Sequence, residues 1–314
     1  MNQELKERLP DVEQGVLLKD YTSFKIGGPA KYFFKAKTNQ DLIGAIKVAR
    51  ELNLPFFILG GGSNLLVSDN GFDGLVIRVS DSRLEAQNSG VVAFAGAKLI
   101  NIVGLATESF LTGFEWAAGI PGTLGGAVRG NAGAFGKFMN NVVDWVEVFD
   151  RQSLEVKKLS NQECEFGHKM SIFKKNPNLI ILSAKIKLEK RDKEKSQKQI
   201  NEYLKLRKQK HPLDFPSAGC VFENYISKEN EWRPEFAKFK ELGAIPTGFL
   251  IEQCGLKGAI IGRAQISAKH ANFIVNLGGA SSQNVVDLII LAKTKVKQKF
   301  NIDIKEEIQY LGFS

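Results

Sequence analysis

The chain has 314 residues, 43% of them hydrophobic, and a formal net charge of +9. This length allows about two domains of ordinary size, and no stretch approaches the roughly 18 consecutive apolar residues of a membrane span. The first residues, MNQELKERLPDVEQ, are polar and mixed in charge, so we expect no signal peptide. These features predict a globular protein without a membrane partner.

The cysteines argue against a disulfide framework or a zinc site. The chain has three, Cys164, Cys220 and Cys254, an odd number, and none of them forms a CxxC pair. We therefore expect no metal, and we expect the reducing cytoplasm as the location.

Most of the positive charge lies in one stretch. Residues 185–210 hold eleven Lys/Arg against four Asp/Glu, a surplus of seven out of the nine charges. A solvated helix beside a domain boundary explains this pattern, and so does a local attraction for a phosphorylated small molecule. Nucleic acid is not an expected partner, because it would require arginines and aromatic residues spread over a groove.

The first half of the chain reads as alternating helices and strands. Thr38, with Asp41 in the capping-box position, begins a helix that continues to about residue 52. The next predicted elements are strands at 55–59, 65–68, 74–79 and 91–97 and a helix over about 98–110.

The second half continues the same mixture of elements. Strands are predicted at 142–150 and 179–189, and the basic stretch follows them. Beyond it we predict a helix near 245–255, a strand through 270–276, a helix over 282–300 and a final strand at 301–312. The class is α+β, with a domain boundary near residues 190–210.

Two glycine clusters interrupt this pattern. Seven of the eighteen residues in GIPGTLGGAVRGNAGAFG, 119–136, are glycine. Each glycine costs roughly 0.5–1 kcal/mol relative to alanine inside a helix or strand, and a flexible linker would contain serine rather than apolar residues. The pattern therefore predicts that a ligand approaches this backbone closely.

The other cluster, GGGSN at 60–64, follows a predicted strand. A Rossmann turn would need a further glycine where Leu65 stands, and a helix after it, so that fold is excluded. A turn whose backbone N–H groups bind an anion remains possible, as does a tight turn between strands. Together, the two clusters fit a long flat ligand, with one cluster at a pyrophosphate and the other at a ring system.

The motifs taken together resemble one family. TSFKIGGPA (22–30), ILGGGSNLL (58–66), GFEWAAGIPGTLGGAVRGNAGAFG (113–136) and SAGCVFEN (217–224) are similar to motifs of the UDP-N-acetylenolpyruvoylglucosamine reductases (MurB) of peptidoglycan synthesis. The resemblance covers nearly the whole chain, in order. The chain is similar to the shorter type, which lacks an insertion bearing a substrate-capping tyrosine.

The resemblance implies a fold and a division into domains. It implies a two-subdomain FAD-binding fold of the PCMH/vanillyl-alcohol-oxidase type plus a C-terminal α/β substrate domain. The FAD-binding domain is expected at 1–200, with subdomains about 1–60 and 61–190. Residues 301–314 are expected to return as a strand to the first subdomain, and 201–300 to form the substrate domain.

The implied reaction has two halves. NADPH reduces FAD, and the enolpyruvyl sugar nucleotide UDP-N-acetylglucosamine enolpyruvate then accepts the hydride and a proton to give UDP-N-acetylmuramate. Such a reaction needs charge stabilisation beside the developing enolate and a proton donor at the alpha carbon.

Three residues match the catalytic positions of the family. Cys220 stands where the family usually has a serine proton donor, and a thiol is a stronger acid than a hydroxyl. Glu307 matches the carboxyl that polarises the enolate. Lys169 follows His168 where the family has Tyr-Arg, so the positive charge is kept while the planar fork of arginine is lost. Gln309 replaces a common family arginine.

The resemblance also implies binding residues. Substrate contacts are expected from His168, Lys210, Asn224 and His270, although a buried structural role for His270 remains open. FAD, held without a covalent bond, is expected at Gly60, Gly61, Gly62, Ser63, Asn64, Gly119, Ile120, Pro121, Gly122, Gly125, Gly126, Asn131, Ala132 and Gly133.

Two alternatives belong to other classes of function. One is a flavin oxidoreductase of the same fold that acts on a small alcohol or hydroxy acid, although SAGCVFEN and Glu307 would then be unexplained. The other is a non-catalytic paralogue that binds flavin or a sugar nucleotide, an interpretation that His168-Lys169 leaves open.

Overall fold

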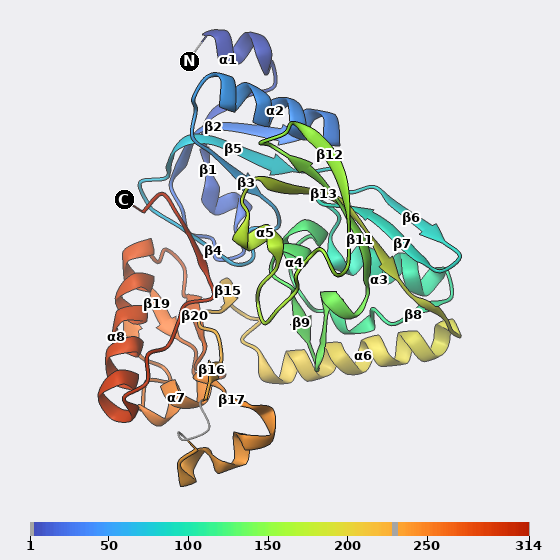
Figure 1. Ribbon diagram of the computed structural model, residues 1–314. Helices are drawn as coiled ribbons and strands as arrows, with labels where there is room; N and C mark the ends of the chain where they lie inside the picture. The colour runs from blue at the N-terminus through green and yellow to red at the C-terminus, as the bar shows by residue number, and fades with distance from the viewer. Residues whose placement is uncertain (1–2, 228–231, 314) are drawn as a thin grey trace. The chain divides into compact units, whose positions relative to one another are not determined.

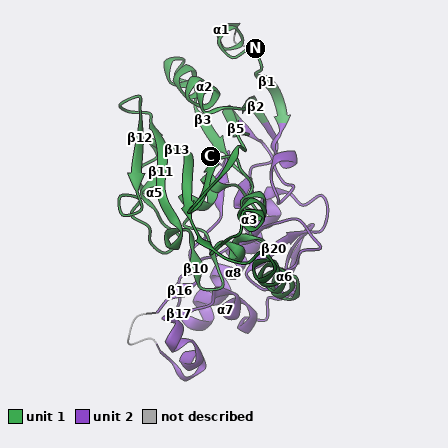
Figure 2. Ribbon diagram, turned by 90° about the vertical axis from the view of Figure 1, so that its right-hand side faces the viewer, with its two compact units in different colours: residues 1–16, 30–61, 73–209 green, residues 17–29, 62–72, 210–314 purple. Residues whose placement is uncertain are grey.

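The computed structural model of the chain describes residues 3–227 and 232–313. Their contacts form two compact units, shown in different colours in Figure 2. The first unit contains 1–16, 30–61 and 73–209, and the second contains 17–29, 62–72 and 210–314. The chain enters the second unit for the last time at residue 210. This position lies at the end of the range 190–210 in which the sequence predicts a domain boundary.

The first unit contains two principal sheets and the helices that pack on them (Figure 1). One sheet has the strand order β1-β2-β5-β3, and the other β12-β11-β13-β7-β6. The bounds of these strands are β1 Glu13–Leu17, β2 Pro29–Ala36, β3 Phe56–Leu59, β5 Phe72–Val79, β6 Leu84–Gln87, β7 Gly90–Phe94, β11 Val143–Asp150, β12 Glu155–Ser160 and β13 Leu179–Lys187. The helices are α1 Gln3–Arg8, α2 Asn39–Glu51, α3 Leu99–Glu108, α4 Leu124–Arg129, α5 Ile172–Lys175 and α6 Lys193–Lys210.

Short elements complete this unit. They are two strand pairs, β8 Leu111–Thr112 with β14 Glu189–Lys190 and β9 Gly133–Ala134 with β10 Lys137–Phe138, and two 3-10 turns, η2 Glu115–Ala117 and η3 Met139–Asn141.

Local sequence signals explain where α2 begins. The Thr38 hydroxyl accepts the backbone N–H of Asp41 at 3.1 Å, and the Asp41 carboxylate accepts the N–H of Thr38 at 3.0 Å. This reciprocal capping box confirms the predicted helix start. The strand β3 and the helix α3 also lie where the sequence predicts them.

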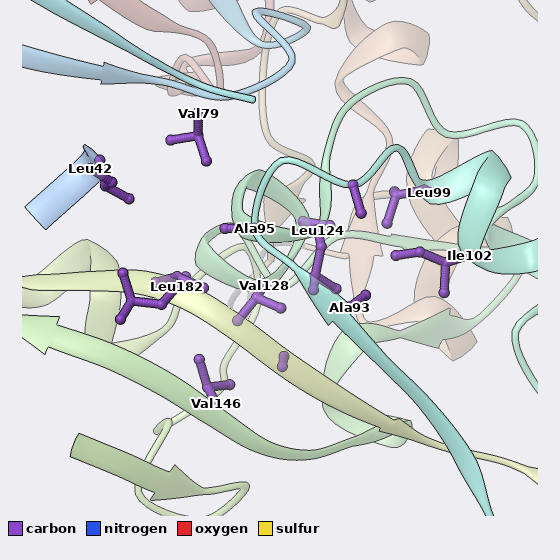
Figure 3. Packing of buried hydrophobic residues seen from close by; sticks show 14 of the residues in the cluster. Leu42, Val79, Ala93, Ala95, Leu99, Ile102, Leu124, Val128, Val146 and Leu182 are labelled. Carbon is purple, nitrogen blue, oxygen red and sulfur yellow. The ribbon is translucent and has the colours of Figure 1, made fainter. Parts of the chain in front are cut away.

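The core of the first unit encloses the short helix α4. This helix lies within the second glycine cluster along the chain, residues 119–136 (the second glycine segment). Figure 3 shows Leu124 and Val128 of α4 among side chains of neighbouring strands, including Ala93 of β7, Val146 of β11 and Leu182 of β13. These side chains are fully or almost fully buried. Truncating a leucine in such a position costs about 2–5 kcal/mol, so the glycine-rich backbone is anchored by its apolar residues.

The basic stretch is only partly helical. The strand β13 continues to Lys187 and β14 covers Glu189–Lys190, so the helix α6 begins at Lys193. Most residues of α6 are exposed.

The second unit has a four-stranded sheet of order β15-β20-β19-β18 and the helix α8 (Figure 1). Its strands are β4 Leu65–Val67, β15 Ser217–Cys220, β16 Tyr225–Ile226, β17 Ala244–Ile245, β18 Ile260–Ile261, β19 Ala264–Ile266, β20 Phe273–Asn276 and β21 Gln309–Leu311. Its helices are η1 Leu18–Tyr21, η5 Pro234–Leu242, α7 Thr247–Gln253 and α8 Ser282–Phe300. The bounds of α8 confirm the predicted helix over 282–300.

The prediction of one strand over 301–312 is wrong. Only Gln309–Leu311 forms a strand, which pairs in parallel with β4. The alternation that suggested a strand comes from the burial of Ile302, Ile304 and Ile308 in the core of the second unit, without a continuous ladder of hydrogen bonds. The C-terminal strand therefore returns to residues 65–67.

Candidate functional site

The first glycine turn, residues 60–64, is held in place through its carbonyl groups. The carbonyl of Gly62 accepts the N–H of Ser23 at 3.0 Å, and the carbonyl of Asn64 accepts the N–H of Gln309 at 3.0 Å. Gly62 has φ +61°, and a β-carbon there would lie 2.1 Å from the carbonyl oxygen of Tyr21. Only glycine fits this position.

The second glycine segment packs against the end of β3 in the first unit. A β-carbon on Gly61 would lie 2.5 Å from the Cα of Gly122, and one on Gly125 would lie 3.0 Å from the Cβ of Ala95. Some of these glycines are thus required because protein backbone approaches protein backbone. The glycine pattern therefore does not report ligand contact alone, as the sequence suggests.

Thr123, which the sequence analysis did not single out, is an orphaned polar group between glycines. Its side chain is 3% exposed, and its Oγ1 has no hydrogen-bond partner among the residues that the structure describes. A β-carbon on Gly60 would lie 2.9 Å from this oxygen, and one on Gly126 would lie 3.9 Å from it. A buried unpaired hydroxyl costs about 1–3 kcal/mol. These residues therefore fit a cofactor that offers phosphate or ring oxygens.

Cys220 lies at the end of β15, after an irregularity in the strand. Ser217 is opposite Val275 and Cys220 is opposite Phe273, with a register shift between the two pairs. Gly219 in that interval has φ +79°. A bulge of this kind re-aims the following side chain, and Cys220 is half-buried.

Glu307 is bonded through its backbone to the segment that follows Cys220. The N–H of Glu307 donates to the carbonyl of Val221 at 2.7 Å, and the N–H of Glu223 donates to the carbonyl of Lys305 at 2.9 Å. The Glu307 carbonyl accepts the side-chain amide of Asn64 at 3.0 Å. The second unit therefore brings together Asn64, Cys220 and Glu307, which lie far apart in the sequence.

Two further residues that the sequence analysis missed hold this arrangement. The carboxamide of Asn272 accepts the N–H of Phe222 at 2.9 Å and donates to its carbonyl at 2.8 Å. The hydroxyl of Ser23 donates to the carbonyl of Ser217 at 2.7 Å. The motif TSFKIGGPA contains Ser23, so the sequence offered a signal for this residue. For Asn272 the sequence showed only a strand pattern, which does not indicate a role in the site.

His270 lies in an aromatic cluster of the second unit. Its ring centroid is 5.0 Å from that of Phe273 and 5.7 Å from that of His211. Burial lowers the pKa of His270 below its ordinary value of 6.5, and its Nδ1 accepts the N–H of Asn272 at 3.3 Å. A neutral ring with this bond carries its proton on Nε2.

The other expected substrate residues of this unit are Lys210 and Asn224. Lys210 ends α6 and is exposed. The Asn224 carboxamide oxygen accepts the N–H of Thr247 at 3.4 Å, which fixes it beside the start of α7.

Lys169 and His168 belong to a tight loop of the first unit. Gly167 and Met170 form a bridge, Lys169 has φ +53°, and its carbonyl accepts the Lys174 ammonium at 2.7 Å. The buried Asn131 donates its amide to the Gly167 carbonyl at 2.8 Å. This bond ties the loop to the second glycine segment.

The comparisons with known proteins follow this division of the chain. Residues 30–158 match a family model described as an FAD binding domain. Residues 211–311 match the model of the UDP-N-acetylenolpyruvoylglucosamine reductase C-terminal domain. The chain is thus a flavoprotein with a PCMH-type FAD-binding domain and a separate C-terminal domain.

Relatives of full length show the same similarity. The chain is 37% identical over 305 residues to the UDP-N-acetylenolpyruvoylglucosamine reductase of Clostridium novyi, covering 96% of this chain and 92% of that one. It is 42% identical over 296 residues to the enzyme of that name from Caldanaerobacter subterraneus subsp. tengcongensis, covering 94% and 92%. The crystal structure of the Thermus caldophilus reductase superposes with a TM-score of 0.76 at 33% identity, covering 96% and 98%.

These similarities establish the family. The chain belongs to the UDP-N-acetylenolpyruvoylglucosamine reductases, the FAD- and NADPH-dependent enzymes of peptidoglycan precursor synthesis.

The described residues contain neither a membrane-spanning helix nor a cluster of metal ligands. No helix within 3–227 and 232–313 is long and apolar enough to cross a membrane. Over the same ranges, no group of three or more His, Cys, Asp or Glu side chains is arranged to hold a metal ion.

Proposed function

We propose that this chain reduces UDP-N-acetylglucosamine enolpyruvate to UDP-N-acetylmuramate, with NADPH as the donor. The observation that carries the proposal is the bonding of the Cys220 and Glu307 segments to each other within a chain of this reductase family. FAD, when bound, supplies the hydride that it receives from NADPH. The proposal places the protein in the cytoplasm, where thiols stay reduced.

The FAD-holding residues are proposed from both glycine clusters. In the first turn, Gly60, Gly61, Gly62, Ser63 and Asn64 offer backbone N–H groups to a diphosphate. In the second segment, the contact residues are Gly119, Ile120, Pro121, Gly122, Gly125, Gly126, Asn131, Ala132 and Gly133. The orphaned hydroxyl of Thr123 supports this assignment. The linkage is proposed to be non-covalent, because neither cluster contains a histidine or cysteine.

Cys220 is proposed as the proton donor. Hydride addition to the carbon beta to the substrate carboxylate leaves an electron pair shared between the alpha carbon and that carboxylate. The Sγ–H proton moves to the alpha carbon, and the thiolate that remains takes a proton from solvent. The bulge at Gly219 fixes the direction of the Cys220 side chain, which supports this role.

Glu307 and Lys169 are proposed to stabilise the charge that develops before this proton arrives. Glu307 polarises the enolate, and Lys169 supplies a positive charge. The backbone bonds of Glu307 to Asn64 and Val221 fix its position and support its role.

The sugar nucleotide is proposed to contact His168, Lys210, Asn224 and His270. The neutral His270 offers a single N–H donor at Nε2, and Lys210 offers a positive charge to a phosphate. We also propose 1–200 as the FAD-binding domain and 201–300 as the substrate domain, with 301–314 returning through its strand to the FAD-binding domain. The matches at 30–158 and 211–311 support this division.

An anaerobic two-step colour experiment tests the function. NADPH should bleach the yellow protein, and UDP-N-acetylglucosamine enolpyruvate should then restore the colour without oxygen. A flavin oxidase would recover its colour with oxygen alone and ignore the nucleotide. A non-catalytic paralogue would bind the nucleotide and stay bleached.

A further inference from the structure

Arg129 is a half-buried cation for which the described residues provide no opposite charge. It is the last residue of α4, inside the second glycine segment. Within 3–227 and 232–313, its guanidinium forms no hydrogen bond, ion pair or ring contact. Burial lowers the pKa of Arg129 below its ordinary value, with no carboxylate to oppose the effect.

An arginine in this position stays charged, because its guanidinium is not deprotonated in proteins. Removing a charge from water without a partner is unfavourable, and such groups are normally paired with an opposite charge. The carboxylates of the neighbouring loop are already engaged: Glu165 with the Lys175 ammonium at 2.7 Å, and Glu163 with the Ser160 hydroxyl at 2.6 Å. Within 3–227 and 232–313 no carboxylate pairs with Arg129, so an anion from outside the chain would supply the opposite charge.

The backbone around Arg129 is fastened to the loop that contains Lys169. The Ser171 hydroxyl donates to the Arg129 carbonyl at 2.7 Å, and Ser171 is fully buried. The Asn131 amide donates to the Gly167 carbonyl at 2.8 Å. The two bonds span the loop on either side of Lys169, so α4 and this loop form one bonded substructure.

We propose that Arg129 binds an anionic oxygen group, a phosphate or a carboxylate, of the flavin cofactor or the sugar nucleotide. This inference rests on the proposed function. A guanidinium grips such a group at two points, whereas the Lys169 ammonium acts as a point charge. Arg129 thus supplies the two-point contact that a lysine at position 169 lacks.

The first arm of the test measures FAD retention. Holoenzymes carrying Arg129→Met, Arg129→Lys and Arg50→Met are diluted, and released FAD is followed by its fluorescence. Arg50→Met is the matched control, since it removes an exposed arginine of the same unit. If Arg129 binds a cofactor phosphate, Arg129→Met should retain FAD about ten- to a hundredfold less tightly, because a charged hydrogen bond is lost, and Arg129→Lys should fall between.

The second arm measures nucleotide binding to the oxidised holoenzyme. Flavin absorbance reports the dissociation constants of UDP-N-acetylglucosamine enolpyruvate and of UDP-N-acetylglucosamine, which lacks the carboxylate. If Arg129 binds the carboxylate, Arg129→Met should weaken only the first by about ten- to a hundredfold. Equal weakening of both places Arg129 at the diphosphate.

Unchanged retention of FAD and unchanged binding of both nucleotides in Arg129→Met would overturn the proposal. If that variant fails to fold, the wild-type protein decides: phenylglyoxal should modify Arg129 more slowly when FAD or the enolpyruvyl nucleotide is bound, and equal rates would reject the proposal. Failure of the proposed function is seen separately, because the wild-type enzyme would then not recover its colour with the nucleotide.

Discussion

The side-chain amide of Asn64 donates to the backbone carbonyl of Glu307 at 3.0 Å, although 243 positions separate the two residues. The N–H of Gln309 returns a bond to the carbonyl of Asn64 at 3.0 Å. The first glycine turn and the segment of a proposed catalytic carboxyl therefore hold each other in place. The turn proposed to hold FAD thus positions the backbone of Glu307.

The first prediction concerns this bond. Asn64→Ala should lower the free energy of unfolding by about 0.5–1.5 kcal/mol, the usual net value of one hydrogen bond. It should slow the recovery of flavin colour by the enolpyruvyl nucleotide more than the bleaching by NADPH, because Glu307 loses its tether. Urea unfolding and stopped-flow absorbance measure the two effects. The exposed Asn70→Ala of the same unit is the control, and equal effects of Asn64→Ala on both half-reactions would contradict the tethering role.

The second prediction concerns the flavin linkage. The three histidines, His168, His211 and His270, all lie outside the glycine clusters, and so do the three cysteines. FAD should therefore leave the protein on acid denaturation and stay in the supernatant. Yellow colour that sediments with the precipitate would show a covalent bond instead.

Much of the fold could be predicted because its signals are local. Thr38 and Asp41 cap α2 with their own side chains, and the apolar spacing over 282–300 matches α8. The segment 301–312 shows the limit of such reasoning. Its alternating isoleucines fit a strand equally well, and only the packing of the second unit decides that they are buried without a ladder.

The bonds that hold the candidate site together cannot be predicted from local sequence signals. The motifs indicated Cys220, Glu307 and the glycines, but no local pattern shows that Asn64 bonds to Glu307 or that Asn272 clamps Phe222. The sequence also does not show which polar side chains are buried. That the Thr123 hydroxyl has no hydrogen-bond partner among the described residues is a property of the folded chain, since the sequence shows only a threonine before a glycine-rich helix.

The third prediction concerns Lys169. If this ammonium stabilises the enolate as a point charge, Lys169→Met should severely slow recovery of flavin colour by the enolpyruvyl nucleotide and leave reduction by NADPH intact. Lys169→Arg should retain activity, because it keeps the charge and adds a planar fork. Both rates come from anaerobic stopped-flow absorbance. Ordinary turnover of Lys169→Met would remove the electrostatic role.

The fourth prediction is a pH dependence of stability from Glu115, a buried residue of the segment before the second glycine cluster. Burial alone would raise the pKa of Glu115, but hydrogen bonds from the Thr112 hydroxyl at 2.5 Å and the Gly113 N–H at 2.9 Å outweigh it. The net pKa lies below its ordinary value of 4.5. The ionised form is thus favoured in the folded state, so its contribution is complete above about pH 4.5 and is lost as the pH falls through the folded pKa.

Glu115→Gln should consequently destabilise the protein most at neutral pH, and the difference from wild type should shrink below pH 4.5. Urea unfolding at pH 7, 5 and 4 measures it. Glu108→Gln changes an exposed carboxylate of the same unit and should give a small, nearly constant difference. A pH-independent effect of Glu115→Gln would mean that shape, and not charge, determines the role of Glu115.

The last prediction separates the two half-reactions at Cys220. Its proton is needed only after the hydride has reached the substrate, so Cys220 has no part in the reduction of the flavin by NADPH. Cys220→Ser should remain active, because a hydroxyl at the same place can donate a proton. Cys220→Ala should retain FAD, bleach normally with NADPH and then stall with the enolpyruvyl nucleotide. General-acid catalysis is typically worth about 10²–10⁴-fold, so the loss should be of that order.

Stopped-flow recovery of the flavin absorbance without oxygen measures all three proteins. Cys254→Ala is the matched control, since Cys254 is a half-buried thiol of the same unit outside the proposed site. A rate for Cys220→Ala within a few-fold of wild type would mean that water or another group donates the proton. The bulge at Gly219 would then serve packing alone.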